Sequence, residues 1–200
     1  MTTTTTLPDP YMVGYRAGEI LDLIRACEEY ARLEESTRMY PDCWATFTGY
    51  PIIARFDLER DAAPLVVEAL RVLALKAAVF ELTGGDEETA ELVISAPVDE
   101  MVHAVLAQYT LCQAMTARLG IRFVHMTDRE RFGWYRDDYT HRCYVAAGWG
   151  EPDPRYWIDG GETARRLAIL NRRYAMIGIR DSGRGHDIGF EPEPVLLTAG

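Results

Sequence analysis

Two of the four histidines in this 200-residue chain follow an aspartate by four residues. Asp99 precedes His103, and Asp137 precedes His141. Residues four apart lie on one face of a helix, so each carboxylate is placed to accept an imidazole N–H. Such a contact fixes the ring tautomer and raises its basicity, as a general base or a metal ligand requires. The spacing predicts acid–base or metal chemistry, and a surface hydrogen bond that only supports the helix is the competing interpretation.

A third histidine, His125, precedes a Thr-x-x-Glu capping signal by two residues, which predicts a position at the mouth between two helices. With His103 and one carboxylate (Asp99, Asp137 or Asp138) it forms a candidate site. Two imidazoles and a carboxylate suit Zn, Fe or Mn. We nevertheless expect no cofactor and a metal-free site, because Asp99 cannot easily be both a third ligand and the group that orients His103. The two histidines are then expected to titrate near neutrality.

Helical spacing of apolar residues predicts the elements that position these groups. About five helices are expected, over residues 15–35, 64–82, 97–119, 127–147 and 162–177. The second and third have the most continuous apolar character, so we expect them to be the most buried. One or two helical turns are expected between Pro41 and Pro51, and only 92–94 and 177–179 have strand character.

The predicted fold is all-α, an irregular bundle of about five helices in a single domain with flexible N- and C-terminal tails. Residues 1–10 are expected to be a disordered lead, because they are rich in threonine and proline. Residues 11–185 form the expected helical domain, and residues 186–200 an extended tail.

Residues 134–157 hold seven aromatic side chains around His141. Aromatic residues at helical spacing are typical of a core. A pocket for an apolar or aromatic ligand, lined by Trp134, Tyr139 and His141, is the alternative.

Lys76 lies in the most apolar helix, and we expect its ammonium to reach the surface beside Glu68. A buried lysine acting as a base or nucleophile is the other interpretation.

The charge balance excludes some partners. The chain has 31 acidic and 21 basic residues, a net charge of −10, which argues against unaided binding to nucleic acid or an anionic membrane. Residues 1–100 hold 19 acids and 8 bases (8 − 19 = −11), and residues 101–200 hold 12 and 13 (13 − 12 = +1). Four charged residues interrupt the most apolar segment, residues 65–82, which argues against a membrane span. No secretory signal is recognised. We therefore predict a cytoplasmic protein, with unpaired cysteines.

The tract 98–106, Val-Asp-Glu-Met-Val-His-Ala-Val-Leu, resembles the Val-Asp-Glu-Val-Trp-His-x-His signature of the glycine-rich domain-containing protein-like family. Arg55-Phe56, the leucine-lysine-alanine segment 73–77 and Phe123-Val124-His125 resemble further motifs of that family. The resemblance extends over about residues 52–157, where the tyrosine- and proline-bearing end also agrees.

This chain departs from the family pattern at several positions. Val102 stands where the family has tryptophan, Val105 replaces the second histidine of the tract, and Met126 follows His125 in place of another histidine. The glycine-rich tail is absent. The resemblance implies Asp99, His103 and His125 as site residues. It also implies a mostly helical domain without an established catalytic activity, linked in plants to stress and hormone responses.

Two functions follow from these observations. The first is acid–base chemistry on a small metabolite, for example in a specialised biosynthetic pathway, by His103 oriented by Asp99 in a pocket shared with His125. The second is a non-catalytic helical module for protein interaction or stress response, whose acidic first half meets a basic partner. The expected partner is a small molecule or a protein, with no nucleic acid and no membrane.

Overall fold

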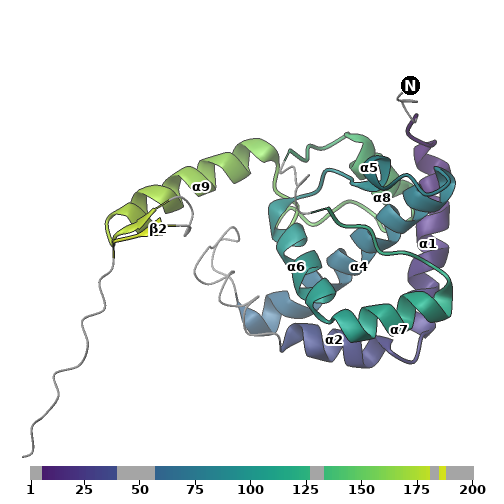
Figure 1. The fold of residues 1–200 in the computed structure, drawn as a ribbon. Coiled ribbons are helices and arrows are strands. Elements are labelled where there is room, and N and C mark those ends of the chain that lie inside the picture. Colours follow the sequence, from purple (N-terminus) through teal and green to yellow (C-terminus); the bar gives the residue numbers. More distant parts are fainter. Residues whose placement is uncertain (1–5, 40–56, 127–132, 181–184, 188–200) are drawn as a thin grey trace, which may run out of the picture. The chain divides into compact units, whose positions relative to one another are not determined.

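The computed structural model describes residues 6–39, 57–126, 133–180 and 185–187, and these form eight α-helices and one pair of two-residue strands (Figure 1). The expected all-α class is confirmed. The elements are α1 (Pro10–Ala26), α2 (Tyr30–Arg38), α4 (Leu58–Leu82), α5 (Glu87–Ala90), α6 (Ala96–Ala107), α7 (Tyr109–Leu119), α8 (Tyr139–Ala146), α9 (Gly160–Ala175), β1 (Ile179–Arg180) and β2 (Gly185–His186). Among the described residues, no helix combines the length and the apolar character that a membrane crossing requires.

The chain divides into two compact units, residues 1–163 and 164–200. The second unit contains most of α9 and the antiparallel pair of β1 and β2, in which Ile179 lies opposite His186. The expected strand at 177–179 is therefore found only from Ile179 onward, and residues 92–94 are assigned to no strand.

Helix α4 is the centre of the first unit, and both α1 and α6 pack against it (Figure 1). Fifteen of its 25 residues are buried, so the expectation of a central helix here is confirmed. Helix α6 is also largely buried, with 8 of its 12 residues inside. In α7 only Cys112 and Met115 are buried, so the prediction of a buried helix over 97–119 is wrong for its second half.

Helix α4 begins at Leu58, earlier than the predicted start at Pro64. A reciprocal cap explains this start, because the Asp57 carboxylate accepts a bond from the Arg60 N–H (3.0 Å) and Asp61 accepts one from the Asp57 N–H (2.7 Å). These bonds satisfy backbone groups of the first turn. Pro64 therefore lies inside the helix, near its N-terminal end.

Two expected helices are each divided in two, and with the short α5 this raises the number of helices above five. The segment 15–35 is interrupted at Cys27, which is extended (ψ 141°), and Glu29 just beyond it is bound by Arg118 of α7 at 3.0 Å. The segment 97–119 is interrupted at Gln108 (ψ 47°). No glycine or proline marks either break, and a contact between distant segments, that of Glu29 with Arg118, accompanies the first of them.

Helix α8 begins at Tyr139, so the predicted helix over 127–147 is wrong for residues 133–138. Asp137 has a left-handed backbone (φ 68°), and the Asp138 carboxylate caps the helix by accepting a bond from the His141 N–H at 2.8 Å. The Thr-x-x-Glu capping signal, the segment between Pro41 and Pro51 and residues 1–5 of the lead lie outside the described residues.

Helices α1 and α8 approach so closely that only glycine fits at position 14. A Cβ on Gly14 would lie 2.6 Å from backbone atoms of Ala146 and Ala147. We expect Gly14→Ala to lower the free energy of unfolding by about 2 kcal/mol, because the added methyl must push the two helices apart. Denaturation in urea measures this change.

Gly18, one turn further along α1, is the matched control. A Cβ there would meet only the Ala147 carbonyl oxygen, at 3.8 Å. Gly18→Ala is therefore expected to be neutral, or stabilising by up to about 1 kcal/mol through helix propensity. Equal effects of the two substitutions would contradict the close approach.

Candidate functional site

The structure brings Asp99, His103 and His125 together, as expected. Asp99 and His103 lie one turn apart on α6, and the His103 Nε2 is 3.6 Å from the Asp99 Oδ2. His125 comes from the segment after α7, and its ring centre is 4.7 Å from that of His103, with the ring planes 60° apart. One ligand atom from each of the three residues lies within 4.8 Å of the others.

These three residues differ sharply in exposure. The side chains of Asp99 and His125 are 3% and 4% exposed, whereas that of His103 is 34% exposed. His103 also has the Glu100 carboxylate 3.9 Å from its Nδ1. Of the three, His103 is therefore the residue that a dissolved molecule reaches first.

Lys76 of α4 extends this cluster into the core, contrary to the prediction that it reaches the surface beside Glu68. Its side chain is fully buried, and its Nζ donates to the Glu91 Oε1 at 2.5 Å. The same Nζ lies 3.3 Å from the His125 Nδ1. Glu68 is occupied elsewhere, where it accepts bonds from residues that include Tyr144. The prediction was wrong because the partner of Lys76 lies in another segment, after α5.

Glu91 connects helix α4 to the segment that carries His125. One of its carboxylate oxygens binds Lys76, and the other accepts a bond from the Met126 backbone N–H at 2.8 Å. Since Met126 directly follows His125, this bond fixes the backbone that carries the histidine. Sequence reasoning missed Glu91. The signal that could have found it was Lys76 itself, because a lysine inside a continuous apolar run is buried and needs an acidic partner.

The contact with Lys76 determines the protonation of His125. An ammonium group only donates, so the His125 Nδ1 accepts and the ring proton lies on Nε2. Burial lowers the pKa of His125 to about 3, assisted by the positive charge of Lys76 and by the charge that His103 takes up on protonation. The prediction that both histidines titrate near neutrality is therefore wrong for His125.

We expect His125 to remain neutral in the folded protein at every pH above about 4. In the unfolded chain its pKa returns to about 6.5, so below that pH the unfolded state binds a proton that the native state does not. The free energy of unfolding therefore falls as the pH drops from about 6.5 toward 3, by up to about 1.4 kcal/mol per pH unit from this residue. An NMR titration of the ring signals measures the pKa directly, and a midpoint near 6.5 would contradict the assignment.

Asp99, His103 and His125 fit a metal ion poorly. Ligand atoms around zinc lie about 2.0–2.2 Å from the ion, and thus about 3.3–3.6 Å from one another. The three groups here spread to 4.8 Å, and the Lys76 ammonium beside His125 would repel a cation. Asp138, the alternative third ligand, is instead the cap of α8. The arrangement suits proton exchange better than metal binding.

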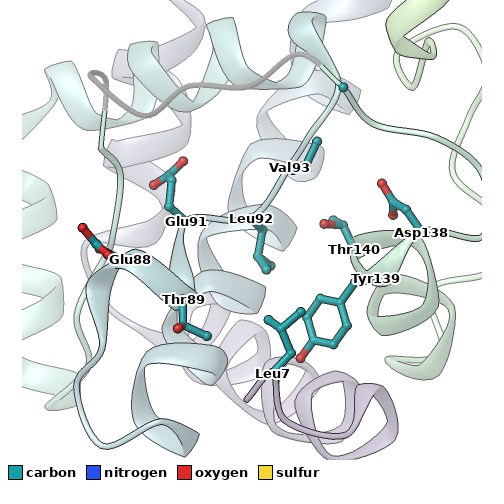
Figure 2. Close-up of a pocket in the computed structure, with 10 residues that line it drawn as sticks. Leu7, Glu88, Thr89, Glu91, Leu92, Val93, Asp138, Tyr139 and Thr140 are labelled. Carbon is teal, nitrogen blue, oxygen red and sulfur yellow. The ribbon is translucent and has the colours of Figure 1, made fainter. Parts of the chain in front are cut away.

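The three predicted pocket-lining residues do not share one pocket. Trp134 and His141 line a cavity of about 480 Å³ together with Trp157. Tyr139 lines a different cavity, of about 400 Å³ (Figure 2). Neither cavity is lined by Asp99, His103 or His125. Asp137 and His141 do lie close, with 3.7 Å between the Asp137 Oδ1 and the His141 Nδ1. This pair does not belong to the group of Asp99, His103 and His125.

Most of the aromatic segment is core, which was the expected interpretation. Tyr144, Tyr156 and Trp157 are each at most 4% exposed. Their polar atoms bind two buried acids of α4: the Tyr144 hydroxyl and the Trp157 Nε1 donate to Glu68, each at 2.9 Å, and the Tyr156 hydroxyl donates to Asp61 at 3.0 Å. These bonds attach α8 and the segment after it to the central helix, so we interpret both acids as structural.

Comparison with known proteins found no family model that matches this chain, and no curated protein or solved structure that matches it. The function must therefore be argued from the chemistry of the site itself.

Proposed function

We propose that Asp99, His103 and His125 form an acid–base site for a small molecule, in which His103 exchanges the proton with the ligand. The observation that carries this proposal is a continuous series of ionisable groups from the surface to the core. It runs from half-exposed His103 through His125 to fully buried Lys76 and its partner Glu91.

A purely structural role explains such a series badly. Buried ion pairs contribute little net stability, because the desolvation of both charges offsets their attraction, and apolar replacements are often as stable or more so. Displaced pKa values beside a surface-reaching histidine are typical of functional sites. The low pKa of His125, together with the buried Lys76 next to it, supports a functional interpretation.

The two histidines have different roles in this proposal. His103 accepts the proton, since the carboxylates of Asp99 and Glu100 lie 3.6 and 3.9 Å from its ring nitrogens and stabilise a positive ring. These distances are too long for hydrogen bonds, so the stabilisation is electrostatic and strengthens when the ring is protonated. His125 stays neutral, so the proton remains on His103 until it returns to the ligand.

Proton exchange with an unidentified ligand is detected by deuterium. The protein is incubated in D2O with a small-molecule extract of cells, and mass spectrometry identifies compounds that gain deuterium at carbon only when protein is present. We expect at least one such compound with the wild-type protein, and its labelling should be lost with His103→Gln.

His141→Gln is the matched control, because His141 also follows an aspartate by four residues but does not belong to the group of Asp99, His103 and His125. It should retain the labelling. Labelling that survives in His103→Gln, or an extract in which no compound is labelled by the wild-type protein, would contradict the proposal. The second result would favour the non-catalytic interaction module.

A further inference from the structure

A separate cavity lies between the segment around α5 and the start of α8 (Figure 2). Its volume is about 400 Å³, within the range of sites for small molecules. One side is formed by residues 88–93, and the other by Gly133, the first residues of α8 and Leu7 near the N-terminal end. The Tyr139 hydroxyl donates to the Pro8 carbonyl at 2.8 Å, which holds the N-terminal segment against α8.

The lining of this cavity is acidic and apolar. Three carboxylates belong to it, those of Glu88, Glu91 and Asp138, and no arginine, lysine or histidine is among the lining residues in the described part of the chain. Leu92 and Val93 supply apolar walls. Glu91 is already bound by Lys76 and by the Met126 N–H, so Asp138 is the carboxylate that bears on a ligand, and a carboxylate favours a ligand that donates hydrogen bonds and carries a positive charge.

Thr140 gives this cavity a specific polar contact. The residue is only 2% exposed, and Figure 2 shows its side chain directed into the cavity. Its hydroxyl makes no side-chain hydrogen bond within the described ranges, in contrast to Thr89 across the cavity, which donates to Asp86 at 2.9 Å. Because it lines the cavity, this hydroxyl is placed to exchange a hydrogen bond with a molecule bound there.

Asp138 is held in place beside Thr140. Its two carboxylate oxygens accept bonds from the backbone N–H groups of Tyr135 (3.1 Å) and His141 (2.8 Å). The Thr140 backbone N–H also bonds to this carboxylate, which leaves about one of its four lone-pair positions for another donor. Burial raises the pKa of Asp138, so a cationic neighbour would favour its charged form.

We propose that this cavity binds a small primary amine with a hydrocarbon body. The ammonium donates to the Asp138 carboxylate and the Thr140 hydroxyl, and the hydrocarbon lies against Leu92 and Val93. The inference does not rest on the acid–base proposal, although Glu91 belongs both to this cavity wall and to the contact with Lys76.

The test compares three probes of similar shape and different charge in NMR titrations of the full-length protein. The probes are 2-phenylethylamine, 2-phenylethanol and 3-phenylpropionate. We expect the amine to shift the backbone amide signals of Leu92 and Thr140 in a saturable way, and to bind at least about tenfold more tightly than the alcohol or the acid.

Two conservative variants locate the binding. Thr140→Val keeps the size of the side chain and removes the hydroxyl, and Asp138→Asn removes the charge while remaining a good helix cap. Each is expected to weaken amine binding by about five- to tenfold. Asp22→Asn, which removes an exposed carboxylate of α1, is the control and should bind as the wild type does.

Several results would overturn the inference: no saturable shift with any probe, equal affinity for the amine and the alcohol, or unchanged amine binding by a folded Asp138→Asn variant. If Thr140→Val does not fold, the binding measured with Asp138→Asn alone decides the test.

Discussion

Replacing Lys76 with methionine is expected to lower the free energy of unfolding by about 3–5 kcal/mol at neutral pH. Methionine preserves most of the buried volume, so the loss arises from the partners left behind. The Glu91 carboxylate, whose side chain is 8% exposed, would lose its counter-ion, and the His125 Nδ1 would lose its donor. Urea denaturation measures the change.

A double variant separates the loss of the pair from the loss of the lysine. In Lys76→Met combined with Glu91→Gln, no unpaired charge remains, and we expect most of the stability to return. Lys76→Met should also raise the pKa of His125, because one of the charges that lowers it is gone. A single variant that is as stable as the wild type would show that Lys76 is not held in a buried ion pair.

Replacing Asp61 with alanine is the second substitution with a large expected effect. Asp61 is fully buried and accepts two bonds from Arg155, each 2.7 Å long, and one from the Tyr156 hydroxyl. It also accepts the Asp57 N–H at the start of α4. Removing the carboxylate takes these bonds away from the Arg155 guanidinium, the Tyr156 hydroxyl and the Asp57 N–H, which should cost about 3–5 kcal/mol.

An exposed carboxylate provides the comparison for Asp61. Glu19 of α1 pairs with Arg16 at 3.0 Å, but its side chain is 45% exposed. Glu19→Ala should therefore cost less than about 1 kcal/mol. Similar losses of stability for the two substitutions, measured in the same denaturation experiment, would contradict the structural role of Asp61.

Local patterns predicted the central helices correctly and their ends poorly. The apolar run before Leu82 identified α4, and its start was misplaced because the reciprocal bonds between Asp57 and Asp61 were not recognised. The breaks at Cys27 and Gln108 carry no glycine or proline. Contacts such as that between Glu29 and Arg118 join segments distant in sequence, so no local pattern predicts them.

The candidate site was predicted only in part, because some of its contacts also join segments that are distant in sequence. Asp99 and His103 are neighbours on one helix, so their spacing alone predicted their contact. The partner of Lys76 lies 15 residues away on another element, and only the folded chain brings Glu91 and His125 to it. The low pKa of His125 follows from that burial, which spacing does not reveal.

The central claim is that His103, and not His125, is the histidine that exchanges protons with a ligand. Diethyl pyrocarbonate reacts with accessible, unprotonated imidazoles, and peptide mass spectrometry gives the rate at each histidine of the folded protein. We expect His103 to react faster than His125 and His141, whose side chains are only 4% and 6% exposed. Reaction at His103 no faster than at His125 would contradict the account.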